Sequence, residues 1–188
     1  MQTFAEYILN EKDFNKKIDI MTYAAKKVPI YFDKSVIFKT IIAKLFIETM
    51  NIDVDKNLII TACLLCSCKK SHDALSLEKV KTYAKESAEY LAKLGFPPRF
   101  CKICLEHNRY NDNTHREKES DILELVDQFG GMMVDREERR GFPLDEALVL
   151  LEHRNLKGCD NIFLEKFKEF INTEMEIIVW LEKVDFLI

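Results

Sequence analysis

The sequence predicts an all-α protein. Apolar residues recur at spacings of three and four along most of the chain, and no segment sustains an alternation of apolar and polar residues. The 188 residues are 47% hydrophobic and 32% charged but include only five glycines and four prolines, which is typical of a compact helical protein. A chain of this length can bury one substantial core, so we expect a single domain over residues 1–188.

Four helices are predicted in the first part of the chain. Apolar spacing indicates helices over 4–9 and 18–27, and Val28-Pro29 interrupts the second because a residue before proline disfavours helical backbone. A longer amphipathic helix is expected over 35–50. The polar turn NIDVDKN then leads into a buried helix over 58–68.

Capping and stop signals place the remaining helices. Ser76 is a suitable N-cap for a helix over 77–94, and Gly95 followed by Pro97-Pro98 predicts its end and the start of a helix over 99–108. The polar stretch NRYNDNTHREKE predicts a surface loop. Helices over 121–135 and 144–151 follow, and the Phe-rich stretch 163–187 predicts one or two more.

Composition and charge exclude several classes of function. The net charge of −4 gives no long-range attraction for nucleic acid or anionic membranes. The longest apolar stretch, LIITACLLCSC, is about half the roughly 20 residues that a membrane-spanning helix needs, so we expect a buried core helix. The N-terminus has no secretory pattern, which predicts a cytoplasmic protein whose six cysteines are reduced.

Five stretches carry a family resemblance when they are taken together. They are DKNLIITACLLCSCKK, TYAKESAEYLAKLG, CLEHNRYND, SDILELVDQFGGMMVDREERRGFPLDEALVLL and GCDNIFLEKFKEFI. In this order they resemble the HD-GYP branch of the HD phosphohydrolase superfamily, whose members are all-α metal enzymes that hydrolyse cyclic di-GMP in bacteria. The resemblance covers about residues 33–172. It implies an HD-domain-like helical bundle with N-terminal (1–32) and C-terminal (173–188) helical extensions.

The resemblance also implies where the metal ligands of the family would fall. Cys66 stands at a histidine position, Ser67 at the bridging aspartate and Tyr83 at another histidine, while Glu106 replaces an imidazole. His107 and Asp127 are retained. No histidine precedes His72, so the ligand that the family has early in the helix over 35–50 is missing, and the Gly-Tyr-Pro stretch is absent.

These replacements predict that the metal chemistry has been lost. Hydrolysis by two divalent metals needs a ring of imidazoles and carboxylates, and the neutral Ser67 hydroxyl cannot balance the charge of two cations. We therefore expect no catalytic residues, no metal and no cofactor. Asp127 is expected to point inward and to be paired with Lys70, whose ammonium would replace the metals as a counter-ion.

A remodelled metal site is an alternative to complete loss. Cys104 lies three residues before His107 on one helix, so Cys66, Cys104, His107 and Asp127 would supply four ligands to one divalent ion such as zinc. The chain would then be a phosphohydrolase with a mononuclear metal. Cysteines that merely fill the volume left by lost histidines are the competing interpretation.

The main functional expectation is a catalytically inactive regulatory or protein-interaction module in bacterial signalling. Its terminal helices, including the apolar end Phe186-Leu187-Ile188, would contact a protein partner or a second copy of the chain. A non-hydrolysing receptor for a nucleotide or cyclic dinucleotide is the alternative. In that case the phosphate contacts would come from four basic residues, which are Lys70, Arg109, Arg139 and Arg140.

Overall fold

The structure is a computed structural model, which describes residues 2–71, 77–110, 116–135, 139–155 and 161–184. These residues form ten α-helices and no β-strand, which confirms the all-α class. Within the described helices, none combines the length and the apolar character that crossing a membrane requires.

The first four helices begin where a side chain caps the backbone. They are α1 (Phe4–Asn10), α2 (Phe14–Ala25), α3 (Lys34–Thr49) and α4 (Lys56–Leu65). Each follows a threonine or aspartate whose side chain accepts a hydrogen bond from a backbone N–H of the first turn. Asp13 plays this role for α2, which therefore starts at Phe14 and not at residue 18 as predicted.

Helix α4 ends earlier than predicted, and this places two site residues in a turn. Beyond Leu65 the backbone tightens, because the N–H of Cys68 bonds to the carbonyl of Leu65 and the N–H of Lys70 to that of Ser67. Cys66 and Ser67 consequently lie just past the helix end and not within it.

The second part of the chain supplies six helices. They are α5 (Leu77–Lys93), α6 (Pro98–Glu106), α7 (Lys118–Met133), α8 (Leu144–Asn155), α9 (Leu164–Thr173) and α10 (Met175–Lys183). Gly95 has a φ of +85°, which is the left-handed conformation of a residue that ends a helix. The Phe-rich stretch forms two helices that meet at Glu174. Ser76, Cys159, residues 111–115 of the expected surface loop and the apolar C-terminal end lie outside the described residues, and the loop is shorter than predicted because α7 already begins at Lys118.

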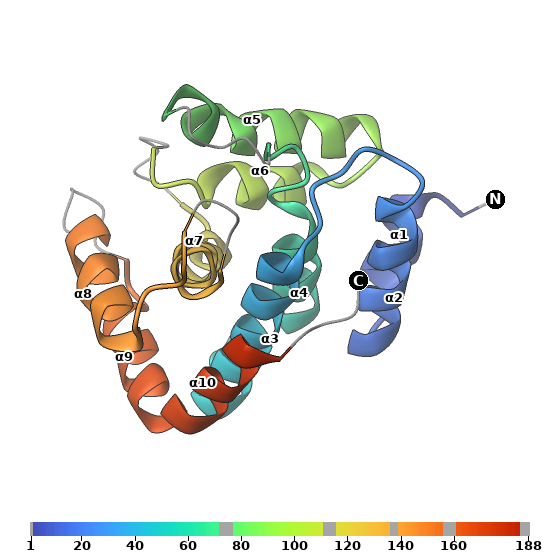
Figure 1. The fold of residues 1–188 in the computed structure, drawn as a ribbon. Coiled ribbons are helices and arrows are strands. Elements are labelled where there is room, and N and C mark those ends of the chain that lie inside the picture. Colours follow the sequence, from blue (N-terminus) through green and yellow to red (C-terminus); the bar gives the residue numbers. More distant parts are fainter. Residues whose placement is uncertain (1, 72–76, 111–115, 136–138, 156–160, 185–188) are drawn as a thin grey trace.

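Helix α3 lies at the centre of the molecule and contacts both α4 and α7 (Figure 1). Helices α5 and α6 pack together and cover one end of this group, while α8 packs against α7, and α9 contacts both α8 and α3. Helices α1 and α2 pack against α4. Four phenylalanine rings join α3, α7 and α9 at ring-centroid distances of 5.1–5.9 Å, and these are Phe46, Phe129, Phe167 and Phe170.

A glycine sets how closely α7 approaches α3. A Cβ added at Gly130 would lie 2.9 Å from Cβ of Lys39, closer than packed carbon atoms tolerate. The absence of a side chain at Gly130 therefore allows the helices to meet beside Lys39, which brings Lys39 within reach of Asp127, one turn earlier on α7.

Candidate functional site

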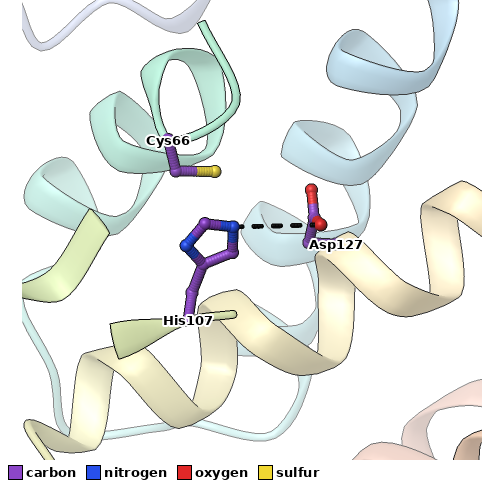
Figure 2. A group of neighbouring side chains, drawn as sticks. All are labelled: Cys66, His107 and Asp127. Atoms are coloured by element: carbon purple, nitrogen blue, oxygen red, sulfur yellow. Dashed lines mark ion pairs between the residues drawn. The ribbon is translucent and has the colours of Figure 1, made fainter. Parts of the chain in front are cut away.

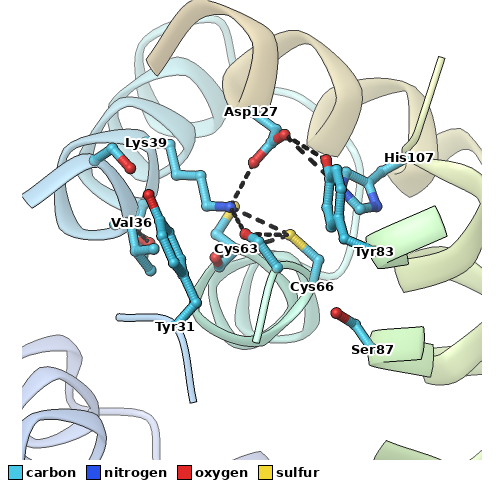
Figure 3. A network of polar contacts seen from close by, with 12 residues as sticks. Tyr31, Val36, Lys39, Cys63, Cys66, Tyr83, Ser87, His107 and Asp127 are labelled. Atoms are coloured by element: carbon cyan, nitrogen blue, oxygen red, sulfur yellow. Dashed lines mark hydrogen bonds and ion pairs between the residues drawn. The ribbon is translucent and has the colours of Figure 1, made fainter. Parts of the chain in front are cut away.

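The site is built around a buried ammonium group. Lys39 projects from α3, and its side chain is only 3% exposed. Its Nζ donates to Oδ1 of Asp127 at 2.6 Å and to Oγ of Ser67 at 2.6 Å, and it lies 3.3 Å from Sγ of Cys66 (Figure 3). A buried ammonium is tolerated when its donors find such acceptors, so the three partners account for its position.

Tyr83 and His107 complete the cluster from the opposite side of Asp127 (Figure 3). Oη of Tyr83, on α5, donates to Oδ2 of Asp127 at 3.0 Å and lies 3.2 Å from Nε2 of His107. Nδ1 of His107 donates to the carbonyl of Cys104 at 2.6 Å. When the imidazole is protonated, Nε2 donates to Tyr83 and the two residues form an ordered chain of donors that ends on Asp127.

The charges in the cluster stabilise one another. Burial alone would raise the pKa of the Asp127 carboxyl, but Lys39, then Lys70 and His107, hold that pKa well below its usual range. Burial alone would lower the pKa of Lys39. The nearby Asp127 carboxylate outweighs this effect, so the pKa of Lys39 is raised. Both groups are thus charged at neutral pH.

Cys66 and His107 form a second pair of opposite charge within the same cluster. Burial opposes ionisation of Cys66, yet His107 and Lys39 lower the pKa of its thiol to about 7. The pKa of His107 is raised in spite of its burial, mainly by Cys66 and then by Asp127. When Cys66 is a thiolate and His107 an imidazolium, two cations, Lys39 and His107, balance two anions, Asp127 and Cys66.

If this charge assignment is right, we expect a Cys66 thiolate to be detectable at neutral pH. The difference in ultraviolet thiolate absorbance between the wild type and Cys66→Ser should show a step with an apparent pKa of about 7. Cys104→Ser is the matched control and should retain the step, since burial raises the pKa of that thiol well above its normal value. A step that appears only in the alkaline range would contradict this account of the cluster.

A pocket of about 460 Å³ opens beside the cluster. Tyr83, His107 and Asp127 form part of its wall, while Lys39 and Cys66 lie behind them and do not line it. Four basic residues surround the rest, and they are Lys70, Arg109, Arg139 and Arg154. The pocket therefore carries a strong excess of positive charge, although the whole chain has a net charge of −4.

The structure brings together most of the residues that the sequence singled out. Cys66, Ser67, Tyr83, His107 and Asp127 all belong to the cluster, as Figures 2 and 3 show for the four that they label. Lys70, Arg109 and Arg139 line the adjacent pocket, whereas the exposed Arg140 does not.

Two expected site residues have other roles. The carboxylate of Glu106 accepts hydrogen bonds from the backbone of Glu117 and the hydroxyl of Ser120, each at 2.9 Å, and so ties α6 to the start of α7. The expected four-ligand metal set is also incomplete. Cys66, His107 and Asp127 bring their ligand atoms within 4.8 Å of one another (Figure 2), but Cys104 contributes its backbone carbonyl to His107 and is not part of the group.

Two residues of the site were missed in the sequence. Lys70 was expected to pair with Asp127, but Lys39 makes the direct contact, while the ammonium of Lys70 lies over the rings of Tyr31 and Tyr83 at 5.5 and 5.7 Å. Lys39 occupies an apolar position of α3, three residues after the buried Val36, and this break in the pattern was the available indication.

Arg154 is the second missed residue. It follows the buried Leu151 by three positions on α8, so it shares the inward face of that helix. A charged residue in the last turn of a helix usually needs no functional explanation, because it interacts favourably with the helix dipole. For that reason the sequence alone did not distinguish it from the other basic residues.

Comparisons with protein-family models, curated proteins and solved structures found no match to this chain.

Proposed function

We propose that this chain is a catalytically inactive, HD-domain-like regulatory module in which the Lys39–Asp127 ion pair replaces a metal centre. The observation that carries the proposal is the position of the Lys39 ammonium, in contact with Asp127, Ser67 and Cys66. A metal that used Asp127 and Cys66 would have to displace this ammonium and share the site with its charge.

Electrostatics supports the loss of metal chemistry. Asp127 is the only carboxylate among the residues in contact with Lys39 within the described chain, and the ammonium already neutralises it. Two divalent ions would bring four positive charges into a buried region where Lys39 already carries a positive charge. The hydrolytic arrangement needs metals that polarise a phosphoryl oxygen and generate hydroxide, and this cluster offers no charge balance for them.

The family resemblance is consistent with the same interpretation. It implies a histidine ligand early in the third helix, and Lys39 comes from that helix. It also implies histidines at Cys66 and Tyr83, and both of these residues now take part in hydrogen bonds within the cluster. The replacements therefore form a connected polar network that occupies the region where the resemblance implies metal ligands.

An interaction role is supported by the surface of α10. Three large apolar side chains on this helix are substantially exposed, at 45% for Met175, 40% for Ile177 and 62% for Trp180. A protein partner or a second copy of the chain would cover them. We propose that the module acts in cytoplasmic bacterial signalling through such contacts.

The phosphohydrolase with one metal is the competing function, favoured by the close approach of Cys66, His107 and Asp127. Elemental analysis of purified protein, joined to assays of phosphodiester hydrolysis with added manganese, iron or zinc, separates the two. We expect substoichiometric metal and no turnover of cyclic di-GMP or of a chromogenic phosphodiester.

His107→Ala is the control for that assay, because it removes a ligand required by any metal mechanism at this site. A background rate that is equal in the wild type and in this variant reflects contamination. Stoichiometric metal that is lost in Asp127→Asn would show that a metal binds at the site, and a rate abolished by His107→Ala would show that the site is an enzyme.

A further inference from the structure

The pocket beside the cluster is lined by two arginines, Arg109 and Arg154, whose charge no carboxylate balances within the described residues. Arg109 follows α6, and Arg154 lies in the last turn of α8. Neither guanidinium forms an ion pair with a carboxylate anywhere in the described part of the chain. Among the described residues that line the pocket, the one carboxylate is Asp127, which is already paired with Lys39.

The arginines also act on one another. Burial lowers the pKa of Arg154, and the charges of Arg109 and Arg139 lower it further. Like charges gathered in a partly buried pocket destabilise the folded protein unless an anion joins them. Arg109 and Arg154 are thus placed to bind an anion and do not form ion pairs within the described residues.

Arg139 has a separate structural role within the cluster. Its guanidinium donates to the carbonyls of Gly131 and Met132 at the end of α7, and it lies 4.9 Å from the ring centroid of Phe142. These contacts fix its position, and its charge acts on Arg154. Arg139 therefore adds to the positive potential, while Arg109 and Arg154 remain available for direct contact with a ligand.

The volume and the lining residues of the pocket suit a small anion. A volume of about 460 Å³ accommodates a small molecule, and the wall includes the rings of Tyr110 and Phe142 beside the arginines. The guanidinium of Arg109 lies over the Tyr110 ring at 4.7 Å, which holds its planar fork at the edge of the pocket. A planar fork of N–H donors matches the oxygens of a phosphate group.

We propose that this pocket binds a small phosphorylated molecule, with Arg109 and Arg154 as the direct phosphate contacts and with Arg139 and Lys70 as supporting charges. The inference rests on the proposed absence of hydrolysis, since an inactive site can retain such a ligand unchanged. It replaces Arg140, which the sequence suggested, by Arg154 of α8.

Pyrophosphate is the probe for the test, because it supplies phosphate groups without a base or sugar. Isothermal titration calorimetry should detect binding to the wild type, and Arg154→Gln should weaken it at least about tenfold through loss of a charge-assisted contact. Arg154→Lys should retain part of the affinity, because it keeps the charge without the planar fork.

Lys93→Gln is the matched control. It removes the same charge from an exposed position on α5, ten residues beyond Tyr83 and about 15 Å along the helix. This variant should bind pyrophosphate like the wild type, and circular dichroism should show that the Arg154 variants remain folded.

The outcomes distinguish this inference from the proposed function. Absence of pyrophosphate binding to the wild type, or equal affinity in folded Arg154→Gln, would overturn the phosphate site and leave the inactive module in place. Binding with release of orthophosphate that depends on His107 would instead overturn the proposed absence of catalysis, while the phosphate contacts would still stand.

Discussion

Replacing Lys39 by methionine is expected to destabilise the folded protein by about 3–5 kcal/mol at neutral pH. Methionine preserves most of the length and apolar volume of the side chain, so the loss of stability results from removing the ammonium group. Asp127 would remain in a partly buried position without its closest cation, which now lies 2.6 Å away, and Ser67 would lose its donor. Urea unfolding followed by circular dichroism measures the change.

Two further variants isolate the charge effect. Lys44→Met removes an ammonium from the exposed face of the same helix, where Lys44 pairs with Glu48, and should change stability by less than about 1 kcal/mol. The double variant Lys39→Met, Asp127→Asn should recover much of the loss, because no unpaired charge remains. If Lys39→Met is no more harmful than Lys44→Met, the buried ion pair does not have the role assigned to it.

The loss in Lys39→Met should also depend on pH. In the wild type the pKa of Asp127 is lowered on folding, so its contribution is present above the unfolded value of about 3.9 and is lost as pH falls through the folded value. Without Lys39, burial raises this pKa relative to the wild type and the charged carboxyl is penalised at neutral pH. The difference between the two proteins should therefore shrink on acidification.

Phe167→Ala is expected to destabilise the protein by a similar amount, about 3–5 kcal/mol, by emptying the centre of the core. The ring of Phe167 is fully buried and lies 5.1 Å from Phe46 on α3 and 5.5 Å from Phe129 on α7, measured between centroids. Removing it leaves a cavity where α9 joins the two helices that carry Lys39 and Asp127. Calorimetric or urea unfolding gives the free energy directly.

Trp180→Ala is the control for this core substitution. It deletes an even larger aromatic ring, but Trp180 is 62% exposed on α10, so the change should be within about 0.5 kcal/mol. Comparable losses in the two variants would mean that α9 is not held to α3 and α7 as the structure has it.

Helical periodicity was enough to predict the fold class and the approximate position of each helix. The errors lie at helix ends, where local backbone contacts decide. The N-cap side chain of Asp13 starts α2 four residues before the predicted position, and the tight turns after Leu65 end α4 before Cys66. Spacing of apolar residues carries no information about either effect.

The site was only partly predictable for a different reason. Cys66, His107 and Asp127 could be grouped because a family pattern relates their positions. Lys39 reaches them across 88 residues of sequence from Asp127, and its role depends on the close approach of α3 and α7 at Gly130. Such a partner is fixed by tertiary packing, which single-sequence reasoning does not supply. Arg154 escaped notice in the same way, because only the packed pocket brings it near Arg109.

The proposed function requires that the Lys39 ammonium takes the place of the metals beside Asp127. A crystal structure of the protein grown with excess manganese, with anomalous scattering recorded for that metal, tests it most directly. We expect no anomalous peak beside Asp127 and a Lys39 ammonium in hydrogen-bond contact with that carboxylate. A strong peak coordinated by Asp127 and His107, with Lys39 displaced, would contradict the account.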